Sequence, residues 1–168
     1  MADLLETITQ SLLSQLVEIP IIRSQQDGPR PKLPYATYQI NSRVTVGSDH
    51  YGWVDGGGLM PIKGTREGTI LVNFYGEEAR ENADNLVNTL RKVTSHYLMR
   101  RLKLVIASSS AVVDMTPLRD SAHFEPMANV DLTFRYTADY GDEVGIIEQV
   151  SASGNIDKIE INQIIKGH

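Results

Sequence analysis

Residues 129–140 alternate between apolar and polar side chains, and this alternation constrains the fold more than any other feature. The polar or charged residues occupy the odd positions, and the apolar ones occupy the even positions: Val130, Leu132, Phe134, Tyr136, Ala138 and Tyr140. Successive side chains of a β-strand point to opposite faces, so the pattern predicts a strand with one apolar and one solvated face. Such a strand fits an antiparallel sheet that is covered on one side only.

Two amphipathic helices are expected to supply that cover. Residues 2–19 carry apolar side chains at three- and four-residue steps, and Pro20 then ends the helical pattern. Residues 77–99 repeat the pattern, with Glu77 and Glu78 at the positive end of the helix and with Val93 and Tyr97 in the apolar stripe. The predicted class is α+β: a mainly antiparallel mixed sheet, two helices packed on one face, and long loop or hairpin extensions.

The chain of 168 residues has the usual size of one domain, so we expect a single domain over residues 1–168. A tight turn is expected at residues 153–155, because Ser, Gly and Asn favour turns. The other expected segments are a Pro-rich connector at 20–34, a Gly-rich loop or hairpin at 47–68, a C-terminal extension at 156–168, and strands at 35–46, 69–75, near 112–116, 128–140 and 144–151.

Three segments offer side chains for contact with a partner. The Pro-rich connector holds a local cluster of positive charge, and its alternative role is a stiff, solvated linker. Residues 47–68 contain seven of the thirteen glycines and the only tryptophan, which favours a loop that orders against a neighbouring subunit. The Ile-rich C-terminus packs either on its own domain or on a neighbour. The candidate interface residues are Arg23, Arg30, Lys32, Tyr51, Trp53, Ile159 and Ile161.

Composition argues against several function classes. A net charge of −5 disfavours a dedicated nucleic-acid binder, and the absence of cysteine removes disulfides and thiolate chemistry. The histidines have no metal-ligand spacing, and no catalytic or cofactor motif appears, so we expect no metal, no cofactor and no enzyme activity. No signal peptide or membrane span is expected, which favours a soluble protein made in a reducing cytosol.

The basic residues at 100–103 either complement a helix dipole or bind an acidic partner.

Residues 25–37 read Gln-Gln-Asp-Gly-Pro-Arg-Pro-Lys-Leu-Pro-Tyr-Ala-Thr. This segment resembles the opening of the neck or tail terminator proteins of long-tailed bacteriophages, where a Gln, a Pro-Arg-Pro and a Pro-Tyr lead into the first strand. A Gly-rich excursion, a strand ending in Tyr-Gly-Glu-Glu-Ala at residues 75–79, a long helix and further strands follow in the order of that family. The resemblance covers roughly residues 1–150 and leaves the role of the Ile-rich C-terminus open.

The resemblance implies a structural virion protein, assembled in the host cytoplasm, that forms a closed, usually hexameric ring on the head-proximal end of the tail. Its implied partners are sister subunits, the tail tube protein, the head-connector or stopper protein and, in contractile tails, the sheath. Genomic DNA would pass through the lumen without specific binding, and the overall charge predicts that acidic residues dominate the lumen or the outer rim. Alternative functions are a head-completion or stopper protein of the neck, and a small enzyme or accessory factor.

Overall fold

The computed structural model describes residues 4–26, 28–115, 118–120, 123–146, 149–156 and 159–166. The chain divides into two compact units, which we call the first unit (Met1–Ser48 and Gly64–Ala138) and the second unit (Asp49–Lys63 and Asp139–His168). Strands β2, β3 and β8, defined below, contribute residues to both units. The expected organisation of residues 1–168 as a single domain stays a prediction.

Six strands form one mixed sheet, which confirms the predicted α+β class. The strands are ordered β1-β2-β3-β8-β4, with β5 also paired to β8. β1 runs parallel to β2, whereas β4 and β5 run antiparallel to β8. The bounds are β1 (Ile21–Arg23), β2 (Tyr35–Tyr51), β3 (Leu59–Tyr75), β4 (Leu104–Ser109), β5 (Val113–Asp114) and β8 (Met127–Glu143). Two further pairs are β6 (Leu118–Asp120) with β7 (His123–Phe124), and β9 (Gln149–Ile156) with β10 (Ile159–Lys166).

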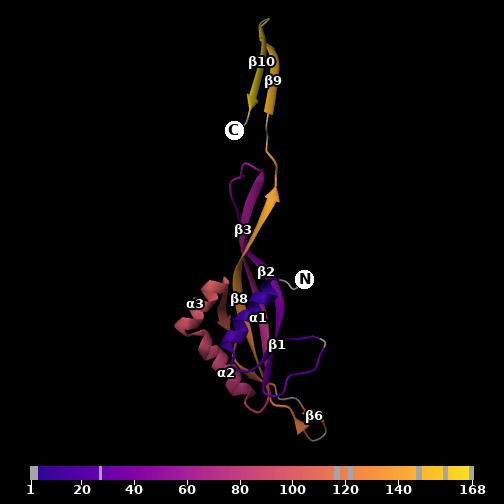
Figure 1. The fold of residues 1–168 in the computed structure, drawn as a ribbon, viewed down its shortest axis with the longest axis vertical. Helices are drawn as coiled ribbons and strands as arrows, with labels where there is room; N and C mark the ends of the chain where they lie inside the picture. Colours follow the sequence, from indigo (N-terminus) through magenta and orange to yellow (C-terminus); the bar gives the residue numbers. More distant parts are fainter. Residues whose placement is uncertain are drawn as a thin grey trace. The chain divides into compact units, whose positions relative to one another are not determined.

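One hydrophobic core joins the helices to alternate residues of β2, β3 and β8. The helices are α1 (Leu4–Leu16), α2 (Ala79–Leu90) and α3 (Val93–Leu102), and they gather beside the sheet in Figure 1. The largest fully buried side chains include Leu12, Tyr38, Phe74 and Phe134. Because the inward residues of β3 and β8 alternate with exposed or half-buried ones, the sheet is covered on the side that the sequence predicts.

The helix predicted over residues 77–99 is divided in the structure into two helices, α2 and α3. Lys92 precedes α3 with an extended backbone, and the Ser95 hydroxyl donates a 2.6 Å hydrogen bond to the carbonyl oxygen of Thr89. One extended residue turns the following helix about its axis. Val93 and Tyr97, predicted to lie in the buried stripe, are therefore 68% and 67% exposed.

The Gly-rich segment 47–68 is mostly strand, so of the two predicted forms the structure has the hairpin. β2 and β3 extend well beyond the strands predicted at 35–46 and 69–75, and they are neighbours in the sheet. A connection of seven residues at 52–58 joins them, which is too short for a parallel crossover. Val44 and Val46 continue the apolar alternation of residues 35–46 but are exposed, and Ile40 is the last residue of β2 that packs against the core.

The C-terminal boundaries also differ from prediction. Residues 144–146 are not a strand, and the turn predicted at 153–155 lies inside β9, where Gly154 pairs with Ile161. β4 was not predicted, and its register shifts between Ile106 and Ser108, which breaks the alternation that would have indicated it. The strand predicted near 112–116 is only Val113–Asp114 among the described residues.

Gly68 is the tightest described position of β3, and this generates the first prediction. A Cβ at residue 68 would meet the backbone carbonyl oxygen of Ser42 and would lie 2.6 Å from Cζ of Phe134. Since backbone cannot move aside as a flexible side chain can, we expect Gly68→Ala to lower the free energy of unfolding by about 1–3 kcal/mol. Gly56→Ala, whose Cβ meets nothing within 4 Å, is the control in the same urea titration. If the two variants were equally stable, the close packing of Gly68 against Ser42 and Phe134 would be contradicted.

The buried phenol of Tyr38 generates the second prediction. Burial raises its pKa to about 12, and the negative charge of Glu6 adds to this effect. A free phenol has a pKa of about 10, so the folded state favours the protonated form. The raised pKa of Tyr38 therefore adds to the free energy of unfolding. This stabilisation is complete below pH about 10 and is lost as the pH rises to about 12. We expect urea unfolding to show a steeper alkaline loss of stability for the native protein than for Tyr38→Phe, and parallel profiles would exclude Tyr38 as the cause.

Candidate interaction surfaces

The three basic residues of the Pro-rich connector are not equivalent. Nη2 of Arg23 lies 3.2 Å from Oε1 of Glu6 on α1, so this guanidinium ties β1 to the helix. The Arg30 side chain hydrogen-bonds Tyr35, whose ring stacks on Tyr75 with centroids 4.8 Å apart. Burial raises the pKa of Tyr35, and the Arg30 charge opposes that rise. Arg23 and Arg30 thus have roles within the subunit, whereas Lys32 is exposed.

A hollow of about 500 Å³ lies against this connector. It is formed where the loop passes the edge strand β1 and the stacked tyrosines, and residues that line it include Ile22, Arg23, Gln26, Arg30, Pro31 and Tyr75. Pro34, which follows a cis peptide bond, closes the segment against Gly76. The described part of the connector therefore offers a shaped surface to which a partner could bind. Loops on a rigid scaffold commonly carry such contacts.

The turn between β2 and β3 carries Tyr51 and Trp53. Oδ1 of Asp55 accepts hydrogen bonds from the backbone N–H groups of Gly57 (2.8 Å) and Leu59 (3.0 Å). These bonds lie within the turn, and its ordering against a neighbouring subunit stays a prediction. Tyr51 is 60% exposed and Trp53 95% exposed. Because tryptophan is enriched at interfaces, this turn is a candidate contact surface.

Ile159 and Ile161 lie on β10, which pairs with β9 in antiparallel register. Ile159 is opposite Ile156, and Ile161 is opposite Gly154. In the part of the chain that the structure describes, this two-stranded sheet pairs with no other strand. The seven candidate residues thus fall into two groups: Arg23, Arg30 and Lys32 belong to the first unit, and Tyr51, Trp53, Ile159 and Ile161 belong to the second.

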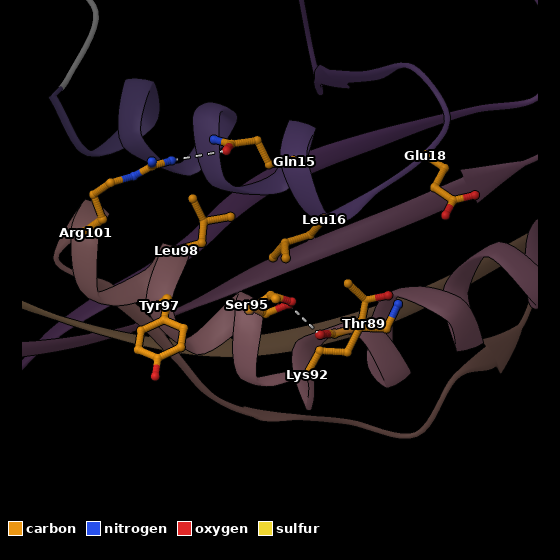
Figure 2. A pocket seen from close by; sticks show the side chains of 10 residues that line it. Gln15, Leu16, Glu18, Thr89, Lys92, Ser95, Tyr97, Leu98 and Arg101 are labelled. Carbon is orange, nitrogen blue, oxygen red and sulfur yellow. Dashed lines mark hydrogen bonds between the residues drawn. The ribbon is translucent and has the colours of Figure 1, made fainter.

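A hollow of about 540 Å³ opens between the C-terminal ends of α1 and α2 and the exposed side of α3. Lys92, Tyr97, Leu98 and Arg101 line this hollow, as does Glu18, and Figure 2 shows their side chains. Nη2 of Arg101 donates a 3.4 Å hydrogen bond to Oε1 of Gln15 on α1. The available signal was a run of basic residues without any carboxylate at 91–103.

The described residues include no group of three or more His, Cys, Asp or Glu side chains placed to hold a metal ion. Within the same residues, no helix is long and apolar enough to cross a membrane. The candidate interaction surfaces are the β2–β3 turn, the β9–β10 hairpin and the hollow beside α3.

Comparison with known proteins agrees with this description. The family described as "Phage neck terminator protein" matches residues 3–164, which is nearly the whole chain. Comparison with curated proteins gives no significant match. The match extends beyond residue 150 and so includes most of the Ile-rich C-terminus. The chain belongs to the phage neck terminator protein family.

Proposed function

We propose that the protein forms a closed, hexameric ring that caps the tail tube and joins the tail to the head connector. Membership of the neck terminator family supports a structural role in the virion. The observation that supports the ring is the register of β9 and β10, which forms a hairpin that pairs with no other strand among the described residues.

The register sorts the hairpin positions by polarity. Residues directly opposite each other in an antiparallel pair share a face. One face holds eight positions, of which all but Gln163 are apolar or glycine: Val150, Ala152, Gly154, Ile156, Ile159, Ile161, Gln163 and Ile165. The other face holds eight positions, of which all but Ile164 are polar: Gln149, Ser151, Ser153, Asn155, Glu160, Asn162, Ile164 and Lys166.

A two-stranded hairpin is marginally stable in water by itself. Its apolar face gains free energy only when another surface covers it, at roughly 25 cal/mol per Å² of apolar area buried. Strand edges that remain unpaired also invite pairing with another chain. A sister subunit supplies such a surface in every copy, so the hairpin is suited to hold neighbours together.

A ring follows if the contact is head-to-tail, because such an interface uses two different surfaces of one subunit and closes when the rotation between copies completes a circle. Closure leaves no free subunit surface at either end of the series, so the ring stops growing in its own plane. The two axial faces then remain for other proteins, which we assign to the tail tube, to the head-connector or stopper protein and, in contractile tails, to the sheath.

Genomic DNA would cross the lumen without specific binding. The chain carries a net charge of −5, and acidic residues at the lumen or outer rim would repel phosphates instead of releasing counterions. This distribution suits a passage for DNA. A head-completion or stopper protein is the alternative neck role, and binding to the connector without binding to tail tubes would favour it.

The third prediction concerns the β2–β3 turn. Replacing Asp49–Lys63 by a two-residue Asn-Gly turn removes exposed Tyr51 and Trp53 while leaving the core of the first unit intact. We expect a lower assembled mass by analytical ultracentrifugation, with or without tail tubes, and a circular-dichroism spectrum that still shows the helices. A deletion variant that forms the native oligomer would remove this turn from the interface.

The fourth prediction tests the apolar face of the hairpin. Ile161→Asp places a charge among the apolar positions, whereas Asn162→Asp places the same charge on the opposite, polar face of the hairpin. We expect Ile161→Asp to reduce ring formation strongly and Asn162→Asp to leave it near native, because burying an unpaired carboxylate is costly. Equal assembly of both variants would show that this face is not an interface. Absence of any oligomer in the native protein, with or without tail tubes, would contradict the ring itself.

A further inference from the structure

The surface of α3 is strongly basic. Residues 91–103 contain five Lys or Arg and no Asp or Glu, and all five side chains are exposed: Arg91, Lys92, Arg100, Arg101 and Lys103. Within the described part of the chain, none of the five forms an ion pair, and Arg101 hydrogen-bonds the neutral side chain of Gln15. Glu18 also lines the adjoining hollow, so the five neighbouring cations have one carboxylate near them, and an anionic partner would relieve the repulsion that remains.

The helix dipoles favour most of these cations but supply no counter-charge. Arg91 is the C-cap residue of α2 and Lys103 that of α3, while Arg100 and Arg101 lie in the last turn of α3, so all four lie at the negative end of a helix. Lys92, however, is the N-cap residue of α3, at the positive end of that helix, where a cation is unfavourable. The dipole of α3 therefore does not explain Lys92.

Exposed apolar side chains accompany the charges. Val93 and Tyr97 on α3 are about two-thirds exposed, and Tyr97 lines the 540 Å³ hollow together with Lys92 and Arg101 (Figure 2). An aromatic and an aliphatic side chain beside arginine is the composition of a protein–protein contact. A nucleic-acid phosphate backbone would use the cations but would leave the apolar side chains uncovered.

The matching negative charge is in the second unit of the same chain. Residues 49–63 and 139–168 contain eight Asp or Glu and three Lys or Arg, a net charge of 3 − 8 = −5. The first unit contains thirteen of each and is neutral. The exposed carboxylates of the second unit include Asp55, Asp142 and Glu143, and its turn presents Trp53.

We propose that the α3 surface, defined as Arg91–Lys103 with the adjoining hollow, receives the acidic second unit of a sister copy. This inference rests on the proposed ring and names the two surfaces of its head-to-tail contact. Opposite charges would steer the two surfaces together, and Trp53 and Tyr97 would supply apolar area to the contact. Covering the α3 surface also removes a basic patch that would otherwise bind the DNA passing through the ring.

The fifth prediction uses a matched pair of charge reversals. Lys92→Glu changes the α3 surface, and Arg80→Glu changes an exposed residue in the first turn of α2. Both substitutions place a carboxylate near the N-terminal end of a helix, where the dipole favours it, so neither should unfold the chain. We expect Lys92→Glu to weaken self-association by about tenfold or more and to reduce its salt dependence, while Arg80→Glu remains near native.

Cross-linking identifies the partner surface directly. The native chain has no cysteine, so Tyr97→Cys and Asp142→Cys each introduce one thiol. Mixing the two singly substituted proteins with a short bismaleimide should give cross-linked pairs, and replacing Tyr97→Cys by Glu81→Cys on α2 should not. Pairs formed by Tyr97→Cys alone would show that α3 meets α3, which would overturn the proposal.

The outcomes separate this proposal from the ring. If the native protein forms no oligomer with or without tail tubes, the ring is wrong and the proposal fails with it. If the native protein and Lys92→Glu assemble equally, the ring stands and α3 is not its receptor surface. If assembly is equal but Lys92→Glu loses affinity for a double-stranded DNA fragment, α3 is a DNA-binding surface and the proposal is overturned.

Discussion

The structure depends on covering one face of a twisted sheet and leaving the other in water. Ile70, Val72 and Phe74 of β3 and Val130, Leu132 and Phe134 of β8 are fully buried, and the helices close over them. β2, β3 and β8 are each seventeen residues long, longer than the helices can cover. The strands therefore continue into a unit whose apolar residues have no helical layer of their own. This arrangement favours the proposed assembly of subunits, because exposed apolar surface is stabilised when another chain covers it.

The sequence could predict the covered part of the sheet and not its limits. Alternation requires only that one face be apolar, and this indicated most of β8, residues 35–46 of β2 and residues 69–75 of β3. Alternation could not show that the helices cover β2 only as far as Ile40. Val44 and Val46 continue the apolar pattern although both side chains are exposed to water. The break at Lys92 could not be predicted either, because no residue propensity indicates it. This one extended residue moves Val93 and Tyr97 from the expected buried stripe to the surface.

The candidate surfaces could be located from sequence, but their geometry could not. Ser153, Gly154 and Asn155 are turn residues by propensity, yet they lie inside β9. A shift in register moves side chains to the opposite face of a strand, so the wrong turn hid the division of the hairpin into an apolar and a polar face. The cations of α3 were recognised as a cluster and attributed to the dipole of one continuous helix. The break between α2 and α3 places Lys92 at the positive end of α3, so the dipole of that helix does not explain this residue.

The distribution of charge also bears on symmetry. A two-fold contact between two second units would bring a net charge of −5 against −5, and a two-fold contact between two α3 surfaces would bring five cations against five. Both arrangements repel, and like charges across an interface cost several kcal/mol. The remaining pairing, of unlike surfaces, is heterologous, and heterologous contacts produce rings or open filaments instead of closed dimers. Segregated charge therefore favours a heterologous contact, which is the kind of contact that the proposed ring needs.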